Sequence, residues 1–217
     1  MAKKKIKKED LITKYMEHVL DNGTPPASVF KFAKTHGFQE ADFYQFFGSF
    51  EALQQAIFVQ FFQTAETLLD KNDDYQSFDA RNKLLSFYYT FFELLTANRS
   101  YVLVALDSHR DHLKNIKTLS PLKKAFTQYI AGLDIDTIDL KQEQVEKFQQ
   151  RSLQESAWIQ LVLILKFWLD DTSPAFEKTD IFIEKSINTS FDVLDVQPLR
   201  SLIDLGKFLF KEKIQMS

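Results

Sequence analysis

Apolar residues recur at helical spacing along nearly the whole chain, and no segment shows the alternation of a half-buried strand. The pattern predicts a first helix ending at Gly23, two short helices between Thr24 and Gly48, and a long fourth helix from Ser49 to about residue 72. Six further segments are expected, at about 77–95, 98–107, 111–132 (broken at 120–121), 142–169, 174–195 and 198–213. The sequence therefore predicts an all-α fold of about nine or ten helices.

The composition agrees with a helical protein and excludes several kinds of site. The 217 residues include only 5 Gly and 5 Pro, but 22 Phe and no Cys. Without cysteine there are no disulfides, thiolate metal sites or cysteine nucleophiles. The sequence contains neither a glycine-rich phosphate loop nor a nucleophile elbow, and no apolar run approaches the roughly 18 residues of a membrane span. We therefore expect neither an enzyme nor a cofactor.

Two histidines lie close together in the sequence beside acidic residues. His109 and His112 are three residues apart and near Asp107 and Asp111, so a site of two histidines and one carboxylate can be drawn. This spacing is common by chance, and we interpret the group as a surface cluster rather than a metal site.

Positive charge is concentrated at the N-terminus, although the net charge is −3. Five of the first eight residues are lysines, whereas residues 9–50 hold three lysines against six acids. Two interpretations of this basic tail remain open. It is either an arm that contacts a nucleic-acid backbone or minor groove, or a solubilising end.

Residues 28–53 have the order of a helix-turn-helix. Ala33 is small where two helices must cross closely, and Gly37 allows the positive φ of a tight turn. Phe38 is then expected to enter the core, and Gln39 to begin the second helix.

This segment resembles the TetR (tetracycline-repressor-like) family of bacterial regulators. The matching residues are Val29, Phe32, Ala33, Gly37, Phe38, Phe43, Tyr44, Phe47, Ser49, Glu51 and Leu53. The resemblance implies a helix-turn-helix head at residues 1–50 and a ligand-binding and dimerisation domain at residues 51–217. It also implies a cytoplasmic homodimer that binds double-stranded operator DNA, expected to be a repressor, and an apolar small-molecule effector.

The resemblance and the residue chemistry together give a set of candidate DNA contacts. Tyr44 can donate to a phosphate and Gln45 can read an adenine edge, but core or ordinary surface roles remain open for both. The full candidate set is Lys3, Lys4, Lys5, Ser28, Gln39, Tyr44 and Gln45. The chain departs from the family where small or basic residues are usual, because it has Glu40, Asp42, Gly48 and Phe50 there. Acids facing a polyanion oppose binding.

Aromatic residues are abundant in the larger domain. They either fill its core or line an apolar pocket between the fifth and eighth helices. The candidate lining is Phe87, Phe91, Tyr129 and Trp158. A ligand there would favour one of two dimer states and so change the spacing of the two heads.

A second resemblance suggests an alternative function. Residues 167–173, with Thr179, Phe182 and Ile183, look like the C-terminal part of the lipid-binding accessory protein of coenzyme Q biosynthesis. That group shares the TetR-like fold, lacks DNA binding and lies on membranes through its last helix. The alternative is thus a DNA-inactive protein that binds lipid or a membrane surface. Its final helix places four basic residues beside apolar ones (Arg200, Lys207, Lys211, Lys213; Leu202, Phe208, Phe210).

Overall fold

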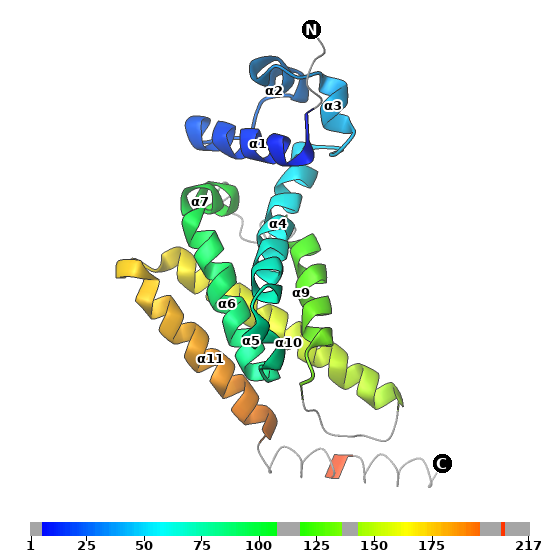
Figure 1. Ribbon diagram of the computed structural model, residues 1–217, viewed down its shortest axis with the longest axis vertical. Coiled ribbons are helices and arrows are strands. Elements are labelled where there is room, and N and C mark those ends of the chain that lie inside the picture. Colours follow the sequence, from blue (N-terminus) through cyan, green and yellow to red (C-terminus); the bar gives the residue numbers. More distant parts are fainter. Residues whose placement is uncertain (1–5, 108–117, 136–142, 196–204, 207–217) are drawn as a thin grey trace. The chain divides into compact units, whose positions relative to one another are not determined.

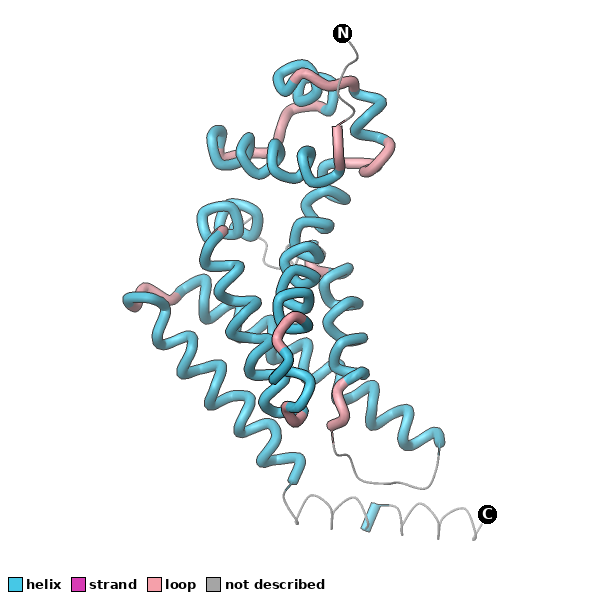
Figure 2. The backbone as a smooth tube through the Cα atoms, viewed as in Figure 1, coloured by secondary structure: helices cyan, strands magenta, loops and turns pink. Residues whose placement is uncertain are grey.

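The computed structural model describes residues 6–107, 118–135, 143–195 and 205–206 (Figures 1 and 2). Every regular element in these ranges is a helix, so the predicted all-α class is confirmed. The predicted helix at 198–213 and the histidine pair His109 and His112 fall outside the described residues.

The helices follow the predicted order closely. They are α1 (Lys8–Asn22), α2 (Val29–His36), α3 (Glu40–Tyr44), α4 (Phe50–Asp70), α5 (Asp73–Ser77), α6 (Ala80–Ala97), α7 (Arg99–Asp107), α9 (Ser120–Gly132), α10 (Glu143–Asp170) and α11 (Glu177–Asp195), with a 3₁₀ turn at Pro174–Phe176. Pro121 lies in the first turn of α9, where a missing backbone N–H costs nothing. The short helix α5 was not predicted, because five residues are too few to show a period.

The chain packs as two compact units, and each is described by itself. The first comprises residues 1–71 and 90–126, and the second comprises residues 72–89 and 127–217. The predicted division after residue 50 follows the motif rather than the packing, and it stays a prediction.

The first unit is built around α1, α4 and α7. Leu11 and Tyr15 of α1 are buried, as are Leu53 and Ile57 of α4. Helix α1 packs on α7, and the Gln54 side chain donates to the carbonyl oxygen of Ala105 at 3.0 Å. This hydrogen bond ties α4 to α7 within the unit.

Three large apolar residues at helical spacing, which a periodic pattern would place on the buried face, are exposed to solvent instead. Leu20, Phe30 and Leu68 are 46 %, 60 % and 47 % exposed. In α4 the buried series at 53, 57, 61 and 65 continues to Leu69, which turns Leu68 outward. In α2 the buried face consists of Val29, Phe32 and Ala33, so Phe30 is left on the solvent side.

The second unit has its core where α10 meets α11. Trp168 of α10 and Ile183 and Ile187 of α11 are fully buried. Figure 1 shows these two helices joined by a sharp corner. We expected Pro174 to open the last long helix, but it opens the 3₁₀ turn, and α11 begins at Glu177.

Candidate nucleic-acid interface and ligand sites

Local hydrogen bonds form the turn between α2 and α3. Ser28 caps α2, because its hydroxyl oxygen accepts from the Lys31 amide at 3.2 Å. Gly37 ends α2 with φ of 74°, which confirms the positive φ expected there. The Phe38 amide then donates to the Ala33 carbonyl oxygen at 3.1 Å. Residues 28–44 thus form a bihelical unit, and α2 packs on α3.

We call residues 6–50, which contain this pair of helices, the head. Aromatic rings fill the interior of the head. The Phe50 ring lies 5.5 Å from Tyr15, 5.6 Å from Phe32 and 5.2 Å from Phe43, measured between centroids. Phe43 is fully buried, as expected for a core residue. Phe50 stands at one of the positions where the resemblance to the TetR family leads us to expect a small or basic residue, and its ring packs inside the head instead.

Helix α3 has a buried face and an exposed face. Phe43 of α3 and Phe47 beyond its end are buried in the head, whereas Ala41 and Tyr44 of α3 face solvent. Gln45, which follows α3 and keeps helical backbone angles, is exposed as well. Ala41, Tyr44 and Gln45 occupy positions i, i+3 and i+4, which share one side of a helix. We call them the α3 face. Two of the predicted DNA contacts therefore lie together at the surface.

The other predicted contacts differ in what their side chains do. Ser28 and Gln39 are exposed, and the Ser28 hydroxyl is already used in capping α2. Lys3, Lys4 and Lys5 lie outside the described residues. The assignment of all seven residues to DNA contact stays a prediction.

The two acids of α3 have local partners. The Asp42 carboxylate accepts from the backbone amide of Gln39 at 3.0 Å, which satisfies an otherwise unpaired N–H at the start of the helix. The Tyr44 hydroxyl donates to Glu40 at 3.5 Å, a long contact. Both carboxylates are half-buried, so these acids serve the helix itself as well as adding negative charge.

A histidine pair lies inside the head and was not singled out from the sequence. The His36 ring is 4.7 Å from Phe32 and 6.1 Å from His18. Its Nε2 atom is buried without a hydrogen-bond partner among the described residues. Burial lowers the pKa of His36 below its ordinary value, and the charges of Lys14 and His18 lower it further, against a smaller opposing effect of Glu17.

The predicted pocket residues are buried or half-buried. Phe87 and Trp158 are almost completely covered, and the Phe87 ring lies 4.7 Å from that of Tyr129. The Tyr129 hydroxyl donates to the Lys83 carbonyl oxygen at 3.2 Å and lies 2.8 Å from the Tyr75 hydroxyl. All of these residues belong to the second unit.

Phe91 is also buried, but it belongs to the first unit. The ligand-lining role of Phe87, Phe91, Tyr129 and Trp158 stays a prediction. Sequence reasoning missed Tyr75 because α5 itself was not predicted.

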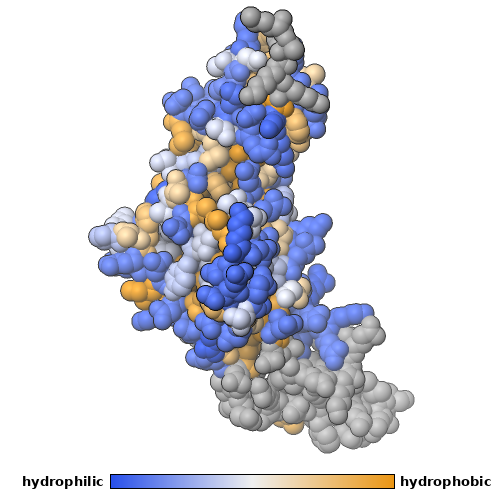
Figure 3. Space-filling model, in the orientation of Figure 1, coloured by the Kyte–Doolittle hydropathy of each residue, from blue (hydrophilic) through white to orange (hydrophobic). Residues whose placement is uncertain are grey.

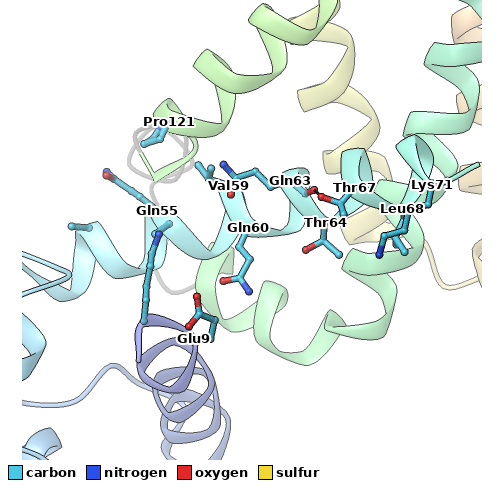
Figure 4. A pocket seen from close by; sticks show the side chains of 13 residues that line it. Glu9, Gln55, Val59, Gln60, Gln63, Thr64, Thr67, Leu68, Lys71 and Pro121 are labelled. Atoms are coloured by element: carbon cyan, nitrogen blue, oxygen red, sulfur yellow. Dashed lines mark hydrogen bonds between the residues drawn. The ribbon is translucent and has the colours of Figure 1, made fainter. Parts of the chain in front are cut away.

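Cavities among the described residues are lined by other side chains. A groove of about 570 Å³ runs along α4 in the first unit (Figure 4), and its walls are mostly amide, hydroxyl and small apolar groups (Lys8, Glu9, Ala52, Gln55, Ala56, Val59, Gln60, Gln63, Thr64, Thr67, Leu68, Lys71, Pro121). A cleft of about 510 Å³ lies at the α10–α11 corner of the second unit (Leu163, Lys166, Phe167, Asp170, Asp171, Thr172, Lys178, Phe182). A cavity of about 60 Å³ lies beside α9.

Asp171 fixes the α10–α11 corner. Its Oδ1 accepts from the Ser173 amide and hydroxyl at 2.8 and 2.7 Å, and its Oδ2 accepts from the Thr179 amide and hydroxyl at 3.0 and 2.7 Å. Burial alone would raise the pKa of Asp171, but these four hydrogen bonds outweigh burial and lower it to about 2. Ala175 and Phe176 have positive φ of 51° and 59°, so the corner also holds strained backbone.

An apolar strip lies on the outside of this corner. Ile159, Leu163 and Phe167 of α10 are exposed at successive helical turns, and Ile181 of α11 is exposed as well. Figure 3 shows hydrophobic surface near the turn between the two helices. We call these four residues the corner strip. Leu163 and Phe167 of this strip also line the cleft at the corner.

The fold and the head define an all-helical protein with an N-terminal helix-turn-helix unit. A family model for the tetracyclin repressor-like C-terminal domain matches residues 83–209, which is more than half of the chain. The chain therefore belongs to the tetracyclin repressor-like (TetR) family, as its N-terminal motif predicted. No curated protein matches the chain. No helix in the described part has the length and apolar character needed to cross a membrane.

Proposed function

We propose that this protein is a transcriptional regulator of the TetR type, a cytoplasmic repressor that binds operator DNA as a homodimer. The observation that carries the proposal is the α3 face. A bihelical unit that turns Tyr44 and Gln45 outward has the form of a reading head, because the second helix of this motif enters the major groove. Membership of the family supports the same function.

A gel-shift titration on the DNA upstream of the protein's own gene tests DNA binding. Full-length protein is compared with a version lacking residues 1–8, at several salt concentrations. The deletion removes five lysines. If all five neutralise phosphates, the slope of log affinity against log salt becomes shallower by about 4 to 5, at roughly 0.9 for each phosphate. The absence of salt-sensitive binding at any site contradicts the proposal.

The corner strip supplies a surface for the homodimer. Its residues come from α10 and α11, and pairing two copies would remove the exposed Leu163 and Phe167 from water. Leu163→Glu is expected to give a monomer in sedimentation analysis. Phe148→Glu changes a more exposed apolar position elsewhere on α10 and is expected to leave the dimer intact. A dimer unaffected by Leu163→Glu refutes this choice of surface.

An apolar small-molecule effector would release the DNA. Support for a site in the second unit comes from its buried aromatic rings, including the pair formed by Phe87 and Tyr129. A thermal-shift screen with fatty acids, quinones and flat aromatic compounds tests this part. A compound that raises the melting temperature of the wild type but not of Phe87→Ala, and that weakens the gel shift, supports it. If no compound raises the melting temperature, this part of the proposal fails.

A second function is favoured by one observation, the sparse positive charge of the head. Residues 6–50 contain five lysines against six acids, and two of those acids are on α3. The alternative is a DNA-inactive relative that binds lipid or a membrane surface. Liposome flotation of the full chain and of a version ending at Asp195 distinguishes the two. Flotation that depends on residues 196–217, together with no gel shift, favours the alternative.

A further inference from the structure

We propose that the head reads A·T base pairs, and that Gln45 and Tyr44 are the residues that select them. This inference rests on the proposed DNA-binding function. It names the kind of operator half-site that the α3 face recognises in the major groove.

The chemistry of the α3 face matches an A·T pair. A glutamine amide has one acceptor and two donors, and it pairs with N6 and N7 of adenine through two hydrogen bonds. Thymine carries a C5-methyl group in the major groove, which is recognised by apolar contact. The Ala41 methyl and the Tyr44 ring provide apolar surface one helical turn apart, and Tyr44 is 53 % exposed. Amide and apolar surface therefore lie on one side of α3.

The same face lacks the groups that read guanine. The commonest guanine contact is a bidentate arginine or lysine on O6 and N7. The first arginine in the chain is Arg81, so the head contains none, and α3 contains no lysine. Lys31 and Lys34 are exposed on α2, which is the helix that crosses the phosphate backbone in this motif.

Both acids of α3 already have a partner within the head for one carboxylate oxygen. Cytosine offers its N4 amino group to a free carboxylate. The Asp42 carboxylate instead accepts from the Gln39 amide, and Glu40 accepts from the Tyr44 hydroxyl. Each hydrogen bond keeps a carboxylate oxygen on the helix.

The test removes the methyl group from the DNA. Half-sites are first selected from random duplexes with the full-length protein, and the best duplex is then made with each thymine replaced in turn by deoxyuridine. Loss of one buried methyl, at about 0.8 kcal/mol, corresponds to about fourfold weaker binding at the contacted position. Tyr44→Ala is expected to abolish this difference between thymine and uridine while retaining residual binding. Gln45→Ala is expected to weaken binding to the contacted A·T pair by fivefold or more and to relax selection at that position.

Two controls separate the outcomes. Gln128→Ala removes an exposed glutamine from α9 and is expected to change neither affinity nor selection. Circular dichroism of each variant verifies that the head is folded. Selected half-sites with G·C pairs at the specified positions, or equal binding of thymine and uridine duplexes at every position, overturn the inference although DNA binding itself stands. If no duplex is selected in a salt-sensitive manner, the proposed function fails together with the inference.

Discussion

Replacing Phe50 by alanine measures how much of the head's stability comes from this ring, which lies between the first three helices. Phe50 contacts three rings, on α1, α2 and α3, at centroid distances of 5.2 to 5.6 Å. Truncating a fully buried phenylalanine costs about 3 to 5 kcal/mol. Because Phe50 is only half-buried, we expect a smaller cost than for a fully buried ring, about 2 to 3 kcal/mol.

Urea unfolding followed by circular dichroism measures this effect. A loss of 2 to 3 kcal/mol lowers the melting temperature of a chain of this size by roughly 5 to 10 °C. Phe30→Ala is the matched control, because Phe30 belongs to the same head but is 60 % exposed, and we expect it to cost under about 1 kcal/mol. Equal stabilities for Phe50→Ala and wild type would refute the packing role that we assign to this ring.

Three further predictions concern the second unit and the histidine of the head. The pKa of Asp171 is lowered to about 2 from an ordinary value of 3.8, so its contribution to stability is present above pH 4 and is lost as the pH falls toward 2. Asp171→Asn should therefore reduce the dependence of the unfolding free energy on pH between these limits. The pKa of His36 is lowered, so the unfolded chain takes up the proton more readily and the head loses stability as the pH falls below 6.5; His36→Phe should remove this slope in thermal melts at pH 5 to 7.5. Tyr129→Phe removes a donor to Lys83 and an acceptor for Tyr75 and should cost about 1 kcal/mol in urea unfolding, with no loss expected for the exposed Tyr44→Phe.

The sequence predicted the helices well because most of them carry a long apolar period. It predicted the turn at Gly37 because glycine adopts a left-handed backbone conformation without the steric cost of a side chain. It placed Leu68 inward because the helical phase drifts over a 21-residue helix, and the structure selects Leu69 instead. Periodicity predicts which face of a helix is buried. Which residue of the last turn is buried depends on the neighbouring element that covers it.

The site was less accessible to sequence reasoning because its contacts join residues that are distant along the chain. The resemblance drew attention to the segment at 167–173 and to Thr179, but it gave no reason for Asp171. That reason is the corner, where one carboxylate accepts four hydrogen bonds across eight residues. Tyr75 was missed because α5 was not predicted, and its partner Tyr129 lies 54 residues away along the chain.

A phenylalanine rather than a lysine at position 50 affects how the head would bind DNA. A lysine at that position would add phosphate affinity that is independent of sequence, whereas the phenylalanine adds packing inside the head. The acids Glu40 and Asp42 lower non-specific affinity further. A larger share of the binding free energy would then come from base contacts of the α3 face, and the N-terminal lysines would supply most of the salt-dependent part.

On this reasoning, deleting residues 1–8 weakens specific and non-specific binding by similar factors, whereas Gln45→Ala weakens specific binding alone. Affinities of the deletion and of Gln45→Ala, each relative to wild type, are measured on one selected duplex and one random duplex. A deletion that weakens binding to the selected duplex alone contradicts this reasoning.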